Sequence, residues 1–298
     1  MTIEKPRHMI GKNLSIKALA TQVRSISMML LVFFFMSCDS KTSELDRPLE
    51  RDTQTTKQSL VQYVNPLMGT DSKYSLSNGN TYPAIATPWG MNFWTPMTSK
   101  MGDGWTYKYN ENKIRGVKQT HQPSPWLNDY AAFSLMAVTG DLKYQEDERE
   151  SWFSHKAEVS KPHYYSVYLA DYDVTMEVSP TERTAHFRFT FPEENSSYIL
   201  LDAFEKGSKV EIIPDQRKIV GYSRYHHGGV PDNFHNYWVA EFDHDFEITH
   251  TWNDQWKLNN DNLKSEGDHV GAIIGFKTQK GEQVQVKVAS SFISEEQA

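Results

Sequence analysis

Apolar and polar residues alternate along much of the chain, which is the pattern of β-strands with one buried face. In residues 184–191, Ala185, Phe187, Phe189 and Phe191 fall on one face of an extended segment, and the residues between them are polar. Similar alternation, or a shorter run of strand-forming residues, occurs in residues 164–169, 174–178, 198–201, 237–242, 272–276 and 284–288. We expect each of these segments to form a β-strand.

Turn-forming dipeptides separate the predicted strands. They are Asn78-Gly79, Gly140-Asp141, Lys206-Gly207, Gly228-Gly229 and Lys280-Gly281. No stretch of a dozen residues has convincing helical spacing. Many short, half-buried strands favour antiparallel sheets that pack face to face. The predicted fold class is therefore all-β, a large antiparallel β-sandwich over residues 63–298.

The N-terminal segment has a different pattern. Basic residues precede an apolar run of eleven residues, 26–36, which is too short to span a bilayer as a lone helix. The run ends at Ser37-Cys38, and this junction resembles the lipobox of bacterial lipoproteins, in which the cysteine thiol is acylated. The resemblance implies a signal peptide over residues 1–37 and lipidation of Cys38. A buried core segment with an incidental cysteine is the alternative.

Residues 38–62 are polar and have no hydrophobic periodicity, so we expect a solvated, disordered tether between the lipid and the domain. The expected location is that of an exported bacterial lipoprotein of the outer membrane, on its periplasmic or cell-surface side. The membrane is then a partner through the lipid anchor.

Charge and cysteine content exclude several classes of partner and site. The chain has 31 basic and 38 acidic residues, a net charge of −7. The first 37 residues contribute five basic residues and one acidic residue, so the remainder carries −11. An acidic surface repels phosphate backbones, which argues against nucleic acid as a partner. Cys38 is the only cysteine, so disulfides within the chain and thiolate metal clusters are excluded.

Aromatic residues are concentrated in a loop-rich region before the clearest strands. Four of the eight tryptophans lie between Trp89 and Trp126, among many glycine, proline, asparagine and aspartate residues. Such loops suit sugar recognition, because pyranose C–H faces stack on aromatic rings while amides and carboxylates bind hydroxyl groups. The alternative is that these tryptophans fill the core of the sandwich.

A series of short motifs occupies the same region. In chain order they are YVNPLMGT at 63–70, GNTYP at 79–83, PWGM at 88–91, WTP at 94–96, IRG at 114–116, QTH at 119–121 and NDY at 128–130. The series resembles the N-terminal domain of the bacterial α-mannosidases of glycoside hydrolase family 92, and the resemblance covers about residues 63–298.

The resemblance implies a calcium-dependent, inverting exo-α-mannosidase that acts on terminal α-mannosides of glycans. Members of the family pair the β-sandwich with a helical (α/α)6 barrel, which carries the general acid, the general base and most calcium ligands. Inversion fits two carboxyl groups about 6.5–9.5 Å apart, with a water between them. The sandwich lends loops to the sugar cleft.

No barrel sequence is recognised in these 298 residues. We therefore assign no catalytic residue and no metal ligand, and we expect a truncated or split enzyme that is inactive alone. The missing catalytic domain is then a partner. A stand-alone, non-catalytic carbohydrate-binding surface lipoprotein is the alternative, and a structural surface lipoprotein without a glycan ligand ranks last.

Five residues are predicted by the resemblance to bind the substrate, a mannose-containing glycan: Asn80, Trp89, Trp94, His121 and Asp129. For Trp89, packing in the core is an equal alternative. His121 and Asp129 could instead hydrogen-bond as a pair that fixes a loop.

Overall fold

The computed structural model describes residues 59–73, 75, 78–121 and 130–298. Within these residues the regular structure consists of β-strands and three single-turn 3-10 helices, η1 (Leu60–Tyr63), η3 (Pro214–Gln216) and η4 (Glu295–Gln297). No helix in this part of the chain is long and apolar enough to cross a membrane. The all-β fold class predicted from the sequence is confirmed. The predicted signal peptide, Cys38 and most of the predicted tether lie outside the described residues.

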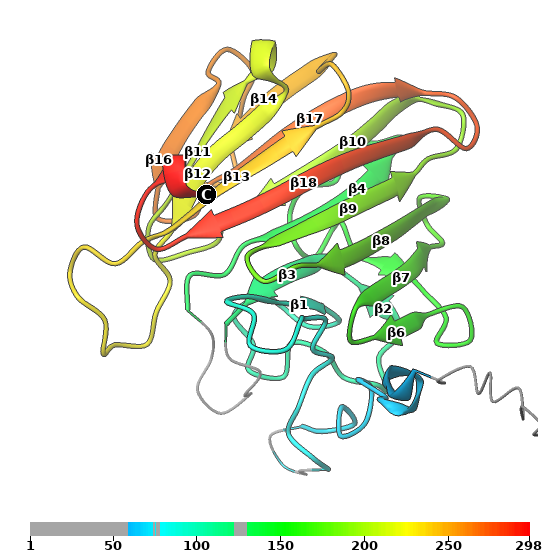
Figure 1. Ribbon diagram of the computed structural model, residues 1–298. Coiled ribbons are helices and arrows are strands. Elements are labelled where there is room, and N and C mark those ends of the chain that lie inside the picture. Colours follow the sequence, from blue (N-terminus) through cyan, green and yellow to red (C-terminus); the bar gives the residue numbers. More distant parts are fainter. Residues whose placement is uncertain (1–58, 74, 76–77, 122–129) are drawn as a thin grey trace, which may run out of the picture. The chain divides into compact units, whose positions relative to one another are not determined.

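One sheet has seven strands, in the order β1-β3-β4-β10-β17-β14-β15 (Figure 1). Its strands are β1 (Phe93–Pro96), β3 (Val117–Thr120), β4 (Ser134–Thr139), β10 (Glu194–Asp202), β14 (Ile248–Trp252), β15 (Leu258–Asn259) and β17 (Gly271–Thr278). The strand pairs of this sheet are antiparallel within the described residues, and β10 pairs with β17 from Glu194 opposite Thr278 to Asp202 opposite Gly271.

The second sheet has nine strands, in the order β16-β11-β12-β13-β18-β9-β8-β7-β6. Its strands are β6 (Val159–Lys161), β7 (Tyr164–Leu169), β8 (Val174–Pro180), β9 (Thr184–Thr190), β11 (Ser208–Ile213), β12 (Lys218–Ser223), β13 (Asn236–Phe242), β16 (Lys264–Gly267) and β18 (Gln283–Ser291). A two-stranded sheet, β2 (Lys113–Ile114) with β5 (Ser151–Trp152), completes the described strands.

The core lies between the two large sheets. Along β8, β9 and β18 every second side chain is buried, as the alternating sequence requires. Trp94 of the seven-stranded sheet makes an edge-to-face contact with Phe187 of the nine-stranded sheet, with ring centroids 4.9 Å apart. Phe133, which precedes β4, packs on Trp238 of β13 at 5.2 Å. These contacts between sheets make the architecture an antiparallel β-sandwich.

Loops from both sheets meet at one end of the sandwich. The hydroxyl of Ser223, at the end of β12, donates to the carbonyl of Ala203, just after β10, at 2.9 Å. The rings of Phe204 and Tyr225 are 4.7 Å apart. We call this the loop end, and it comprises the segments 86–91, 97–107, 203–207, 224–235 and 292–294. The segment between β12 and β13 is the yellow loop that extends beyond the sheets at the left of Figure 1.

Candidate functional site

The segment around Trp89 belongs to the loop end because it is tied to the turn between β8 and β9. The amide of Met91 donates to the carbonyl of Glu182 at 2.7 Å, and the amide of Ser290, at the end of β18, donates to the carbonyl of Arg183 at 3.3 Å. Trp89 itself has a left-handed backbone, with φ of +62°, and its side chain is 101% exposed. A tryptophan is seldom so exposed, and isolated from packing it contributes little to stability.

The segment 97–107 forms the wall of a pocket. The pocket has a volume of about 520 Å³, and its lining residues are Lys73, Ser75, Gly102, Asp103, Gly104, Trp105 and Lys108. This volume lies in the range of small-molecule sites. The lining combines an indole ring, a carboxylate and two ammonium groups. Such a set can stack on the apolar face of a sugar and exchange hydrogen bonds with its hydroxyl groups.

A small apolar cluster packs against the protein side of this pocket wall. Met97, Met101, Ala132, Phe204 and Tyr225 form a buried cluster that is separate from the main core. Gly102 lies directly over the Phe204 ring, since a Cβ atom at Gly102 would come within 3.1 Å of Phe204 Cζ. A side chain at position 102 would therefore push the pocket wall away from its support.

Asn80 is hydrogen-bonded to Ser72, which directly precedes the pocket residue Lys73. Its backbone is left-handed, with φ of +54°, and its amide donates to Ser72 Oγ at 3.1 Å. Its Oδ1 atom is buried and has no hydrogen-bond partner among the described residues. An unpartnered buried acceptor is costly, so it suits a ligand hydroxyl group or a water.

Trp94 lies away from this pocket, in the main core of the sandwich. Trp94 is fully buried on β1 between Phe133 and Phe187, and its indole N–H donates to Asn92 Oδ1 at 3.1 Å. Its side chain therefore belongs to the core, and a ligand at the surface of this domain cannot reach it. This is the alternative that the sequence left open for the tryptophans.

His121 directly follows β3, at the loop end. Its Nδ1 atom is 2.9 Å from the carbonyl oxygen of Tyr130, and its ring lies 5.1 Å from that of Phe292. Asp129 lies outside the described residues, so the predicted pairing of His121 with Asp129 stays a prediction.

A buried charge network, which the sequence analysis missed, lies beneath the loop end. Asp202 accepts hydrogen bonds from Arg149 at 2.8 Å and from His269 at 2.7 Å, and both Arg149 and Asp202 are buried. Burial alone would raise the pKa of Asp202, but the charges of His269 and Arg149 outweigh it and hold the pKa well below its ordinary value. Burial tends to lower the pKa of His269, and the Asp202 carboxylate raises it overall.

A second buried carboxylate holds the far end of segment 97–107. Glu158 accepts hydrogen bonds from the hydroxyl groups of Tyr107, at 3.0 Å, and Tyr165, at 2.7 Å, and it pairs with His155 at 2.7 Å. Burial, followed by the charge of Glu158, raises the pKa of both phenols far above their ordinary value. The phenols therefore stay protonated, which makes this cluster an anchor rather than an acid–base pair.

Among the described residues, no group of three or more histidine, cysteine, aspartate or glutamate side chains is placed to hold a metal ion. We assign no calcium ligand among these side chains, and the calcium ion that the family resemblance implies stays a prediction.

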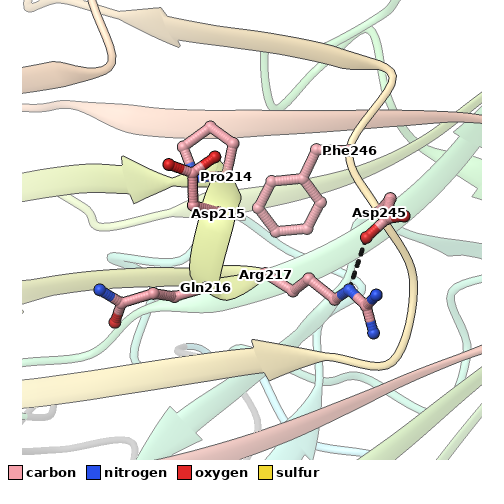
Figure 2. A pocket seen from close by; sticks show the side chains of 6 residues that line it. All are labelled: Pro214, Asp215, Gln216, Arg217, Asp245 and Phe246. Atoms are coloured by element: carbon pink, nitrogen blue, oxygen red, sulfur yellow. Dashed lines mark hydrogen bonds and ion pairs between the residues drawn. The ribbon is translucent and has the colours of Figure 1, made fainter.

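Another pocket, of about 500 Å³, lies at the opposite end of the sandwich, where β11 runs into η3 (Figure 2). Figure 2 shows an ion pair between two of its lining residues, Arg217 and Asp245, and the Nε–Oδ1 distance is 2.5 Å. Both side chains are at least half exposed, and ion pairs of this kind are worth little. None of the sequence motifs reaches this pocket, so we do not consider it a functional site.

Residues 63–291 match the profile of the glycosyl hydrolase family 92 N-terminal domain. The chain belongs to glycoside hydrolase family 92. The match covers the same motifs that the sequence analysis singled out and the whole of the sandwich up to the end of β18. No curated protein is similar enough to the chain to count as a match.

Solved structures of family 92 enzymes share the fold. A family 92 inverting mannosidase of Bacteroides thetaiotaomicron VPI-5482 is 46% identical with a TM-score of 0.77, over 80% of this chain and 32% of that one. A family 92 α-mannosidase of Bacteroides thetaiotaomicron is 30% identical with a TM-score of 0.68, over 79% of this chain and 34% of that one. The latter has also been solved in complex with mannoimidazole. The chain thus spans about a third of the length of the mannosidases that it matches.

Proposed function

We propose that this chain is the N-terminal domain of an exported, calcium-dependent, inverting exo-α-mannosidase that acts on terminal α-mannosides of glycans. The observation that carries the proposal is the gathering of family motifs at the loop end. PWGM directly precedes β1 and QTH ends β3, and Phe93 pairs with Thr120 at that end of the sandwich, while Asn80 of GNTYP is hydrogen-bonded to Ser72, next to the pocket residue Lys73. A family 92 sandwich with its aromatic loops at one end is suited to form one side of a sugar cleft.

Within this proposal the domain binds and orients the sugar, and it does not supply the acid or the base. Trp105 and Trp89 offer ring faces for stacking, and Asn80 Oδ1 offers a buried acceptor for a hydroxyl group. The two carboxyl groups of an inverting mechanism come from the helical barrel of the family. Calcium, as a hard cation with oxygen ligands, would bind sugar hydroxyl groups there and help to distort the ring.

Mannose release from α-mannobiose tests the division of labour. The purified 298-residue chain should release no mannose, with calcium or with a chelator. A chimera in which residues 63–291 replace the matching domain of the 46% identical mannosidase should release mannose. Robust turnover by the chain alone would show that catalytic groups lie within it. Calorimetric titration with millimolar α-mannobiose tests the alternative of a stand-alone binding protein, which fails if the chain alone gives no heat; heat by itself is expected under both hypotheses, because the proposed domain also binds the sugar.

The membrane anchor is a separate part of the proposal and has a separate test. When the full chain is expressed in a Gram-negative host, the wild type should incorporate labelled palmitate and sediment with the membranes. Cys38→Ser should lose the label and become soluble, because the acylated thiol is removed. A wild-type chain that stays soluble and unlabelled would contradict the lipoprotein prediction.

A further inference from the structure

The turn at Phe204–Gly207 has an unusual backbone for its residues. Phe204 and Lys206 are left-handed, with φ of +65° and +67°, and Gly207 has φ of +106°. Non-glycine residues avoid this region at a cost of about 1 kcal/mol or more each. Such a strained turn persists only if the surrounding structure holds it, so the contacts that hold it can be identified.

Asp202 holds the first residue of this turn. Its Oδ1 atom accepts the backbone N–H of Phe204 at 3.0 Å and also binds His269 Nε2 at 2.7 Å. Its Oδ2 atom is bound to Arg149 at 2.8 Å. Ser208 Oγ closes the turn by donating to the carbonyl of Phe204 at 2.7 Å. One buried carboxylate therefore fixes the start of the strained turn.

Arg149 connects the same carboxylate to the other side of the pocket wall. Its guanidinium group donates to the carbonyls of Arg115 and Tyr144, both at 3.1 Å, and so fixes the turn over residues 144–149. In that turn, Glu146 accepts the backbone N–H of Met101 at 2.5 Å. Met101 immediately precedes Gly102, which rests on the Phe204 ring. The pocket wall is thus held by the Phe204 ring and by Glu146, and both are connected to Asp202 by hydrogen bonds, directly or through Arg149 and the turn that it fixes.

We infer that Asp202, held by Arg149 and His269, is a positioning residue that presets the pocket wall Gly102–Trp105 for a sugar ligand. The sugar class of this ligand rests on the proposed function, whereas the positioning role rests on the contacts alone. Asp202 does not touch the pocket, and it acts through Phe204 on one side and through Glu146 on the other.

Hydrogen exchange of the full purified chain, followed by mass spectrometry, tests this role without any ligand. Asp202→Asn keeps the shape of the side chain but removes its charge. It should speed exchange at least tenfold in peptides covering residues 99–107 and 203–207, while peptides within β8 and β9 keep their wild-type rates. The matched control is Glu177→Gln, which removes an ion pair with Arg188 on the outer face and should leave both loop peptides unchanged.

His269→Gln provides a milder variant in case Asp202→Asn does not fold. It leaves the pair between Arg149 and Asp202 in place and should speed exchange in the same two peptides by a smaller factor. The inference is overturned if the loop peptides keep wild-type rates in a folded variant. It is also overturned if all peptides speed up by one common factor, since that is a loss of global stability without positioning.

A ligand arm separates this inference from the proposed function. Millimolar α-mannobiose should protect residues 99–107 in the wild type and protect them less in Asp202→Asn. Faster loop exchange in the variant without protection by mannobiose in either protein would support the positioning role and count against the sugar assignment. Unchanged loop exchange in the variant, together with protection of equal extent in both proteins, would overturn the inference and support the sugar assignment.

Discussion

Replacing Trp94 by alanine should destabilise the domain strongly, whereas replacing Trp89 should not. The two residues lie five positions apart in the same aromatic region, yet one is 0% and the other 101% exposed. A buried tryptophan replaced by alanine costs about 3–5 kcal/mol of the free energy of unfolding, because the contacts are lost and the cavity only partly collapses. A surface substitution away from special features changes it by less than about 0.5 kcal/mol.

The contacts of Trp94 indicate that the Trp94→Ala substitution lowers the free energy of unfolding by an amount near the upper end of this range. Its ring makes edge-to-face contacts with Phe133, at 5.7 Å, and with Phe187, at 4.9 Å, and such pairs add about 0.5–1.5 kcal/mol beyond burial. Its indole N–H also satisfies Asn92 Oδ1, and Asn92 is fully buried. Truncation leaves that acceptor unpaired inside the core. We expect a loss of about 4–5 kcal/mol.

Urea unfolding followed by far-UV circular dichroism measures both variants. With an m-value of about 3 kcal/mol/M, Trp94→Ala should lower the midpoint by about 1.5 M and Trp89→Ala by less than about 0.2 M. Trp94→Phe serves as a control, because it keeps an aromatic ring in the cavity and should fall between the two. A cost below about 1 kcal/mol for Trp94→Ala, or an equal cost for Trp89→Ala, would refute the assignment of the two side chains.

Two further predictions concern the core and the buried charges. Gly271→Ala should lower the free energy of unfolding by about 1–3 kcal/mol, because the new Cβ would lie 1.9 Å from the buried Trp252 ring; an unchanged thermal midpoint would contradict this contact. Burial lowers the pKa of His269, but Asp202 raises it overall. The pair of His269 with Asp202 therefore contributes fully to the free energy of unfolding below about pH 6.5, and this contribution is lost as the pH rises through the pKa of His269 in the folded protein. Wild-type stability should therefore fall over that window in urea titrations at stepped pH, and His269→Gln should flatten the fall; parallel curves would contradict it.

The sequence predicted the strands whose two faces differ, and also the continuous apolar runs 198–201 in β10 and 272–276 in β17, where both faces are buried. One face is buried and the other is more exposed in β7, β8, β9 and β18, so apolar and polar residues alternate in their sequences. β1 was not predicted, since its sequence FWTP has no alternation, and it is a strand because it pairs with β3. The family, too, was recognisable from the sequence, because its motifs are short segments in a fixed order.

The environment of each site residue was decided only by the tertiary structure. Trp89 and Trp94 have similar neighbours in sequence, but a left-handed turn points one into solvent while β1 carries the other between the sheets. Asp202 lies 53 residues from Arg149 and 67 from His269, and no local pattern marks the three as partners. Asp202 and His269 meet because strand pairing brings the end of β10 beside the start of β17. A buried carboxylate is costly unless it is paired, and its partners here come from segments distant in sequence.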